Sequence, residues 1–407
     1  MSAKMTLKDI EIKGKRVLCR VDFNIPLDEE QNITDDTRIV AALPTIQHIL
    51  GQGGKLVLCS HLGRPKGSPD PRFSLAPVAK YLSKLIGVPV AMAPDCIGPV
   101  AEMLTEEMSM GDVVLLENLR FHSGETDNDP EFCQALARLG DVYVNDAFGA
   151  AHREHASTAG VTRYLQPAVS GLLLSKEIHY LGNALANPER PFVAILGGAK
   201  VSDKIPVIEN LLQKVDTLII GGGMAYTFLK AKGHQVGASL VEEDLIELSK
   251  KLMEQADSQG IKLLLPIDHI LADEFKAEAE AQATPDIDIP EGKMALDIGS
   301  ETRRLYCSEL RKAGTVIWNG PMGVFEFEAF AEGTLTVARA LADAEVTSII
   351  GGGDSVAAVT LSGLADQMSH ISTGGGASLE FLEGKQLPGI VSLSDKPDTP
   401  EQPEMEG

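Results

Sequence analysis

The sequence is poor in cysteine and has no long apolar run. Its five cysteines lie far apart and none belongs to a Cys-x-x-Cys pair, so their spacing predicts neither a disulfide framework nor a zinc site. No uninterrupted apolar stretch approaches the ~18 residues that a membrane-spanning helix needs. The opening residues also lack the apolar core of a secretory signal. We therefore expect a soluble protein of the cytoplasm.

Basic residues are scarce as well. The chain has 36 Lys and Arg against 58 Asp and Glu in 407 residues, a formal net charge of −22. Binders of nucleic acid or of anionic membranes need a basic surface, so we expect neither partner. The charge leaves room for a local basic pocket that takes a small anion. Residues 241–291 hold 14 acids against 4 bases, in what we interpret as an exposed helical region.

Short β-branched apolar runs dominate what is present, and most are followed by a helical pattern. Continuous apolar strands that alternate with helices predict an α/β fold with parallel sheets covered on both faces. In such sheets ligands bind beyond the carboxyl ends of the strands. The runs and the loops that follow them occupy residues 16–24, 55–67, 112–122, 141–155, 191–204, 217–226, 314–326, 347–355 and 370–382.

The loops differ between the two halves of the chain. Those of the first half carry polar and basic side chains, whereas those of the second half are glycine clusters at 197–198, 221–223, 351–353 and 374–376. We interpret this as two α/β domains, one that recognises an anion with side chains and one that cradles phosphate with its backbone. Residues 171–191 show helical spacing and predict a connecting helix, with the domain boundary after residue 184. The acidic, proline-rich segment 394–407 predicts a disordered tail.

Each chemical motif also has an ordinary structural explanation. A single glycine cluster can simply permit a tight turn, but four in one half, each before a helix, favour anion binding by unpaired amides. Lys200 and Lys204 are either an exposed surface pair or phosphate ligands at a strand-to-helix turn. Asp354 either caps its helix or holds Mg²⁺ through one carboxylate.

The first half offers arginines suited to bidentate recognition of phosphate and carboxylate, although any one arginine is more often a surface residue. His61 lies in a Gly/Pro loop beside Arg64. His152 and His155 lack the i, i+4 spacing of a zinc helix, and we assign them structural roles. There is no Gly-x-Ser-x-Gly elbow, no P-loop and no Gly-x-Gly-x-x-Gly fingerprint, which excludes the corresponding serine hydrolases, NTPases and dinucleotide enzymes.

Nine segments together resemble the phosphoglycerate kinase family, in order and over roughly residues 5 to 390. They are RVDFNIPLD, SHLGRPKG, LLENLRFH, NDAFGAAHREHAS, LGGAKVSDKI, GGGMAYTFL, WNGPMGVFE, GGGDS and STGGGASLEFLEGKQLPG. The resemblance implies two Rossmann-like three-layer lobes joined by a hinge helix. The lobes would span residues 1–184 and 185–388, and residues 389–407 would return to the N-terminal lobe.

The resemblance also implies reversible phosphoryl transfer between MgATP and the carboxylate of 3-phosphoglycerate by a monomer. The implied 3-phosphoglycerate site comprises Asp22, Phe23, Asn24, Arg38, His61, Leu62, Gly63, Arg64, Arg120 and Arg153. The implied nucleotide site comprises Lys204, Glu326, Gly352, Gly353, Asp354 and Ser355, with Asp354 also holding Mg²⁺. Arg38, Lys200, Gly375 and Gly376 are implied to meet the transferred phosphoryl group.

The chemistry agrees with this set of residues. A carboxylate acceptor is already ionised at neutral pH, so the reaction needs positioning and charge neutralisation rather than a general base. Two substrates on separate lobes would also require closure of the lobes.

Glu154 departs from the family pattern and is expected to pair with Arg153. The alternatives are a non-catalytic two-lobed anion-binding protein and a dehydrogenase; the latter lacks its fingerprint.

Overall fold

Helix α6 (Leu172–Ala186) carries the chain from one folded unit into another. In the computed structural model, which describes residues 3–397, unit 1 comprises the chain up to Glu177 and the segment that begins at Gln386. Unit 2 comprises Ile178–Lys385. The greater part of the acidic tail expected to be disordered, residues 398–407, lies outside the described residues.

Unit 1 is built on a six-stranded sheet in the order β3-β4-β2-β1-β5-β6. All of its strand pairs are parallel. The strands are β1 (Arg16–Arg20), β2 (Lys55–Cys59), β3 (Val90–Met92), β4 (Val113–Leu115), β5 (Val142–Asn145) and β6 (Ala168–Ser170). The helices are α1 (Thr37–Gly51), α2 (Ala76–Ile86), α3 (Pro99–Glu106), α4 (Ser123–Thr126), α5 (Pro130–Ala137) and α14 (Pro388–Val391). The central strands are buried along nearly their whole length, as a sheet covered on both faces requires.

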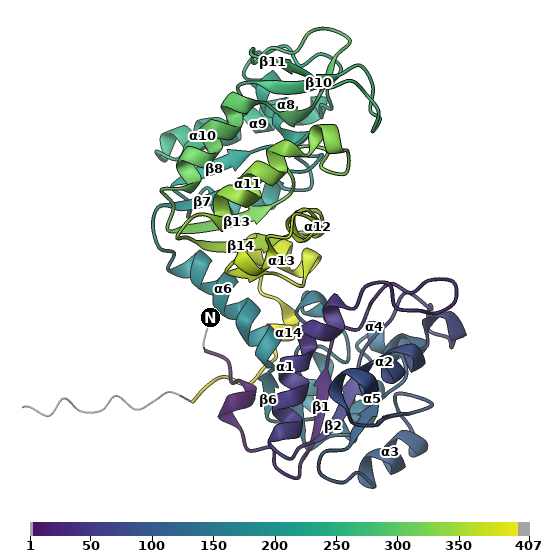
Figure 1. The fold of residues 1–407 in the computed structure, drawn as a ribbon. Helices are drawn as coiled ribbons and strands as arrows, with labels where there is room; N and C mark the ends of the chain where they lie inside the picture. Colours follow the sequence, from purple (N-terminus) through teal and green to yellow (C-terminus); the bar gives the residue numbers. More distant parts are fainter. Residues whose placement is uncertain (1–2, 398–407) are drawn as a thin grey trace, which may run out of the picture. The chain divides into compact units, whose positions relative to one another are not determined.

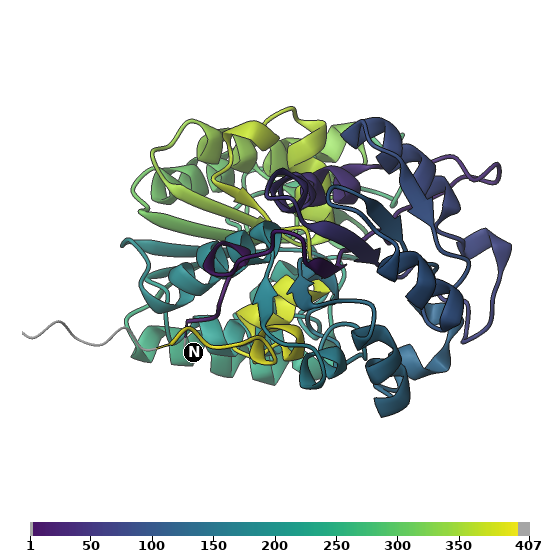
Figure 2. The same ribbon diagram turned by 90° about the horizontal axis from the view of Figure 1, so that it is seen from below.

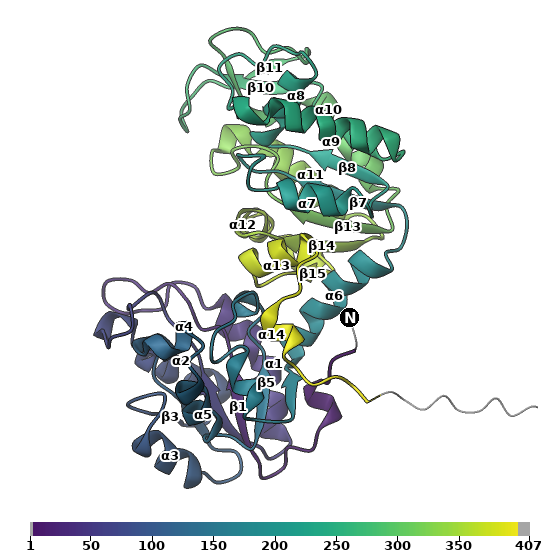
Figure 3. The ribbon, with the colours of Figure 1, turned by 180° about the vertical axis from the view of Figure 1, so that it is seen from behind.

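Unit 2 repeats this architecture with a parallel sheet in the order β15-β14-β13-β7-β8-β9. Helices α7 (Ile205–Leu211), α8 (Met224–Ala231) and α9 (Ile246–Ser258) cover one face (Figure 3). Helices α10 (Ser300–Leu310) and α11 (Glu332–Ala342) cover the other (Figure 1). The strands are β7 (Phe192–Leu196), β8 (Thr217–Ile220), β9 (Lys262–Leu264), β13 (Thr315–Asn319), β14 (Thr347–Gly351) and β15 (His370–Ile371). The predicted α/β class with parallel sheets is confirmed.

The acid-rich region 241–291 is only partly helical, so the helical interpretation was wrong beyond α9. An antiparallel sheet follows, formed by β10 (His269–Ala272), β11 (Gln282–Thr284) and β12 (Met294–Ile298). These strands are too short to give a clear period in sequence. They form because β10 pairs with β12, whose partner residues lie 22 to 29 positions further along the chain, from Ala272–Met294 to His269–Ile298.

The N-terminal turn of α6 is held by a buried carboxylate. Asp146 Oδ1 accepts the backbone N–H groups of Leu173 and Leu174 at 2.9 and 3.1 Å. Burial raises the pKa of Asp146 to about 7, although these hydrogen bonds oppose the shift. The Asp146 side chain, directly after strand β5, therefore fixes the position at which α6 begins.

The C-terminal segment packs back onto unit 1 beside the N-terminal segment (Figure 2). Met5 N–H donates to Ser394 O at 2.8 Å. Gly389 N–H donates to Ala151 O at 2.8 Å, and its carbonyl accepts from Asn145 Nδ2 at 3.0 Å. Among residues 3–397, no helix combines the length and the apolar character that a bilayer span demands.

This packing predicts a stability effect at Gly389. An added Cβ would lie 2.9 Å from Ala151 Cα and 3.1 Å from Ala151 O, where the backbone has little room to move. We expect Gly389→Ala to lower the free energy of unfolding by about 1–3 kcal/mol, as overpacking generally does. Urea denaturation followed by circular dichroism measures this.

Gly51→Ala is the matched control in the same unit. Gly51 ends α1, and an added Cβ there would meet nothing within 4 Å. Equal urea midpoints for the two variants would contradict the close packing of the C-terminal segment.

Candidate active site

Four loops meet at the carboxyl end of the unit 1 sheet because strands β4, β2, β1 and β5 are neighbours. Three of the loops line a hollow of about 530 Å³, which we call the basic hollow. Its lining includes Arg64, Lys66, Arg120, His122, Arg153 and His155. The structure therefore brings together three of the arginines that the sequence singled out.

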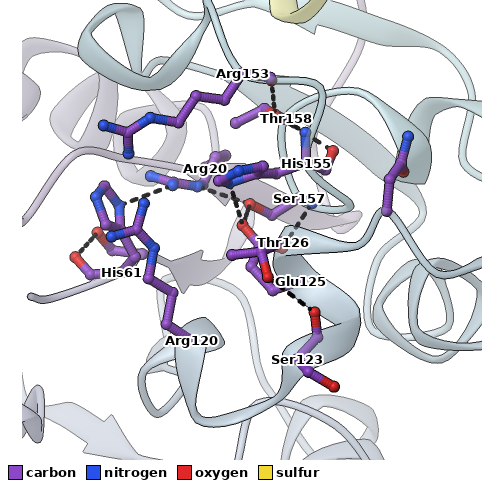
Figure 4. A network of polar contacts seen from close by, with 12 residues as sticks. Arg20, His61, Arg120, Ser123, Glu125, Thr126, Arg153, His155, Ser157 and Thr158 are labelled. Carbon is purple, nitrogen blue, oxygen red and sulfur yellow. Dashed lines mark hydrogen bonds and ion pairs between the residues drawn. The ribbon is translucent and has the colours of Figure 1, made fainter. Parts of the chain in front are cut away.

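Arg20 is the centre of a buried hydrogen-bond network in this region, and the sequence analysis did not identify it. It ends strand β1 and is only 1% exposed. Its Nε donates to Ser157 Oγ at 2.9 Å, and Ser157 in turn donates to Glu125 through its hydroxyl at 2.6 Å and its N–H at 2.9 Å (Figure 4). A charged residue at the end of an otherwise apolar strand was the signal available in the sequence.

Arg20 also determines the protonation pattern of His61. Its Nη2 lies 3.0 Å from His61 Nδ1. A guanidinium group can only donate, so Nδ1 must accept and the ring proton must sit on Nε2. Burial and the surrounding arginines hold the pKa of His61 well below its usual range. His61 is therefore a neutral imidazole that offers one N–H donor.

The positive charges of this region exceed the negative charge that surrounds them. Burial and the neighbouring Arg153 and Arg20 lower the pKa of Arg120 to about 10. Burial, together with Arg120, Arg153 and Arg20, lowers the pKa of His155 to about 4. A multiply charged anion in the basic hollow would relieve this repulsion.

Arg38 lies in a hydrogen-bonded cluster with the loop after β1. It starts the first turn of α1 and donates to Asn24 O at 2.8 Å and to Asp22 Oδ1 at 3.3 Å. Asn24 Oδ1 accepts the Gly63 N–H at 2.8 Å, and Gly63 O accepts from Arg120 Nη1 at 2.7 Å. These contacts connect Arg38 to the loops that line the basic hollow.

The structure also shows where the residues of three other sequence predictions lie. The side chains of Phe23 and Leu62 are buried in the apolar core, so only their backbone groups are available to a ligand. Glu154 was expected to pair with Arg153, but it pairs with Arg163 at 3.4 Å on the surface. His155, given only a structural role from sequence, also lines the basic hollow.

Unit 2 has a second hollow of about 700 Å³, which we call the glycine hollow. It lies where the loops after β7, β13, β14 and β15 meet. Its lining includes Gly197, Gly198, Lys200, Lys204, Asn319, Gly352, Gly353, Asp354, Ser355, Gly375 and Gly376. Three of the four predicted glycine clusters therefore lie together with Lys200, Lys204 and Asp354, whereas Gly222 and Gly223 of the fourth line a neighbouring hollow.

The glycines allow two of these loops to touch backbone to backbone. A Cβ on Gly197 would lie 2.1 Å from Pro321 O, and one on Gly320 would lie 2.2 Å from Gly197 O. Gly320 also has φ +104°, which side chains disfavour. The hydroxyl of Ser355 accepts the Gly320 N–H at 2.6 Å and so braces the same loop.

Two helices begin at the glycine hollow with bare glycines. Helix α12 (Gly353–Leu361) starts at Gly353 and α13 (Gly375–Leu382) at Gly375. Their first backbone N–H groups have no partner within the helix and can donate hydrogen bonds to an anion. Lys204 precedes α7 and donates to Asn319 Oδ1. Burial lowers its pKa, opposed by Asp203 and Asp354.

A third hollow of about 540 Å³ adjoins the glycine hollow and is largely apolar. Its lining includes Tyr226, Leu240, Phe275, Met294, Leu296, Val324 and Glu326. Asp354 lines both hollows. An apolar hollow whose acids are Glu326 and Asp354, next to an amide-rich hollow, suits a nucleoside attached to phosphates.

Comparisons with known proteins decide the family. A model described as phosphoglycerate kinase matches residues 7–385. A phosphoglycerate kinase of Chlorobium limicola is 61% identical over 96% of this chain and 100% of its own length. The chain belongs to the phosphoglycerate kinase family. A phosphoglycerate kinase of Clostridium perfringens is 59% identical over 97% of this chain and 99% of its own.

Solved structures agree with the family assignment. That of phosphoglycerate kinase from Coxiella burnetii has a TM-score of 0.88 at 45% identity, covering 96% of this chain and 98% of that one. That from Pyrococcus horikoshii has a TM-score of 0.81 at 33% identity, with the same coverage. The family and the two-lobe α/β fold implied by the sequence motifs are confirmed, and so is the class of enzyme, a kinase.

The lowered pKa of His155 predicts a pH effect on stability. The unfolded chain takes up a proton at this residue near pH 6.5, whereas the folded chain resists it until about pH 4. Stability is therefore lost as the pH falls through this window. We expect His155→Gln to lose about 2 kcal/mol less than the parent between about pH 7.5 and pH 5.

Urea midpoints at the two pH values test this. His48→Gln, on α1 in the same unit and outside the basic hollow, is the control and should keep the parent's pH dependence. If His155→Gln also kept it, the inferred neutral state of His155 would be wrong.

Proposed function

We propose that the chain catalyses reversible phosphoryl transfer between MgATP and the carboxylate of 3-phosphoglycerate, giving 1,3-bisphosphoglycerate and MgADP. The observation that carries the proposal is the division of chemistry between the units. Unit 1 has an arginine-rich hollow, and unit 2 has amide-rich and apolar hollows side by side. Membership of the phosphoglycerate kinase family supports the same reaction.

In this proposal unit 1 binds 3-phosphoglycerate. Arginines pair with phosphate or carboxylate in the bidentate geometry that lysine cannot supply. His61 adds a neutral Nε2–H donor, fixed in orientation by Arg20. The residues assigned to the substrate are Asp22, Asn24, Arg38, His61, Arg64, Arg120 and Arg153, with the backbone of Phe23, Leu62 and Gly63.

Unit 2 binds the nucleotide. The apolar hollow takes the base, and Glu326 accepts hydrogen bonds from the ribose hydroxyls. The phosphates lie in the glycine hollow against Lys204, Gly352 and Gly353, at the start of α12. Ser355 contributes its backbone amide, because its hydroxyl oxygen is engaged with the Gly320 N–H.

Asp354 is the residue we assign to Mg²⁺. Asp354 lines both the glycine hollow and the apolar one, which supports a position beside the phosphates of a bound nucleotide. One carboxylate combined with phosphate oxygens and water is the donor set that Mg²⁺ usually takes. When bound, the ion neutralises phosphate charge.

The protein's contribution to the transfer step is positive charge. The acceptor carboxylate is ionised at neutral pH, so no residue has to remove a proton from it. Negative charge spreads over the equatorial oxygens of the moving phosphoryl group. We assign their stabilisation to Arg38 from unit 1, and to Lys200 with the amides of Gly375 and Gly376 from unit 2.

No observation favours the alternative of a non-catalytic anion-binding protein, since the relatives compared above bear the name of a kinase.

We further propose that the enzyme works as a monomer in the cytoplasm. Its net charge of −22 disfavours nucleic acid and anionic membranes as partners. Calorimetric titration of ATP against NAD, each with and without 3-phosphoglycerate, separates the kinase from a dehydrogenase.

Arg38→Ala tests the proposed role of Arg38 in transfer. We expect kcat to fall by about 10³-fold, the scale of an arginine that stabilises phosphoryl transfer. MgATP affinity should change little, because Arg38 belongs to unit 1. A coupled assay with 3-phosphoglycerate and ATP measures kcat.

Arg138→Ala is the control for Arg38→Ala. Arg138 is an exposed arginine of the same unit that pairs with Glu102. Turnover equal to the parent's in Arg38→Ala would remove Arg38 from the transfer step.

Lys204→Ala tests the assignment of the nucleotide to unit 2. A charge-assisted hydrogen bond contributes about 1.5–3 kcal/mol, so ATP affinity should fall by at least about tenfold. The affinity for 3-phosphoglycerate should remain close to the parent's. Calorimetry measures both, and Lys251→Ala on the exposed face of α9 is the control. A larger loss for 3-phosphoglycerate would reverse the assignment of the units.

A further inference from the structure

Three potential metal ligands meet in unit 1 without a part in the proposed reaction. They are Asp95 and Cys96, in the loop after β3, and His122, which precedes α4. His122 Nε2 lies 2.7 Å from Asp95 Oδ1, and one ligand atom from each residue lies within 4.8 Å of the other two. Within residues 3–397 this is the one such group of three His, Cys, Asp or Glu side chains.

The donor atoms point to a particular class of ion. A thiolate, an imidazole and a carboxylate form a borderline-soft set that suits Zn²⁺ and its analogue Co²⁺, whereas Mg²⁺ prefers oxygen ligands. We propose that Asp95, Cys96 and His122 form a binding site for Zn²⁺ that is separate from the Mg²⁺ site on unit 2. Three protein ligands and one water would complete the usual four-coordinate shell.

Two of the three ligand atoms, Asp95 Oδ1 and His122 Nε2, are already adjacent. Zn²⁺ would replace the proton that Asp95 and His122 share, and the two ligand atoms would move apart only slightly. The Asp95 and His122 side chains are 46% and 33% exposed, so the ion has a path from solvent, while Cys96 is fully buried. The carboxylate and the thiolate together carry two negative charges, which balance the ion beside a cationic region.

Binding would join two loops of unit 1. His122 follows the turn Leu119–Phe121, which carries Arg120, and it lines the basic hollow itself. On the other side, Asp95 and Cys96 belong to the connection between β3 and α3. An ion held by both segments stabilises the folded state in proportion to its affinity. The cysteine spacing in the sequence could not reveal this site, because its other ligands are Asp95 and a residue 26 positions further on.

Titration of the full chain with Co²⁺, after removal of metals by a chelator, tests the proposal. Thiolate coordination produces a charge-transfer absorption band in the near ultraviolet, which oxygen and nitrogen ligands do not. We expect this band to saturate at one equivalent of Co²⁺ and to disappear when Zn²⁺ is added. A large excess of Mg²⁺ should leave it unchanged. In parallel, Zn²⁺ should raise the thermal unfolding midpoint.

Three variants remove one ligand each. Cys96→Ser should abolish the band, and the partly exposed Asp95→Asn and His122→Gln should each weaken Co²⁺ binding by at least about tenfold. The last two keep the test decisive if loss of the buried thiol unfolds the chain. Cys133→Ser is the control, because the Cys133 thiol lies in the same unit beside Asn128 rather than beside a histidine.

Several results would overturn the proposal. One is the absence of a thiolate band from the parent protein. Another is a band that survives in Cys96→Ser or that Cys133→Ser removes. Equal Co²⁺ affinity in the parent, Asp95→Asn and His122→Gln would also show that the cluster is only an Asp–His ion pair next to a buried thiol.

Discussion

A buried charge must be paired, and in unit 1 this requirement organises the candidate site. Arg20 and Glu125 are both almost completely inaccessible and are connected through Ser157. Leaving a buried charge uncompensated typically costs about 3–5 kcal/mol, whereas an exposed pair such as Arg72–Asp70 is worth about 1 kcal/mol or less. The buried network can therefore hold His61 in one tautomer while the more accessible arginines around it adapt to a ligand.

Unit 2 solves the problem of binding an anion in a different way. Its hollow is lined by backbone amides at the starts of α12 and α13 and by two lysines, and the absence of Cβ atoms lets the loops approach each other. Amides carry no net charge, so the site can accept a polyphosphate without the mutual repulsion that, after burial, helps to lower the pKa values of Arg120 and His155 in unit 1. An acidic protein can hold anions in this way because the favourable groups are concentrated locally.

Much of this arrangement was predictable because it depends on local sequence. The buried β-branched strands, the glycine clusters before helices and the arginines after strands follow from nearest-neighbour pattern and from the rule that parallel strands present their carboxyl ends together. The small sheet of β10, β11 and β12 was missed because its strands are short and depend on distant pairing. Arg20 stood out only as a charged residue at the end of an apolar strand, and nothing local shows that Ser157 contacts it and connects it to Glu125.

The sequence by itself therefore determined the chemical types and their order: side chains for an anion in the first half, glycine amides for phosphate in the second. Only the tertiary structure decided which of these groups meet. In the folded chain Glu154 pairs with Arg163 rather than with Arg153, and the hydrogen bond from Arg20 fixes the ring proton of His61 on Nε2. Cys96 lies close to His122. The physical reason is that sheet order and burial set the distances between loops, and no local pattern in the chain encodes those distances.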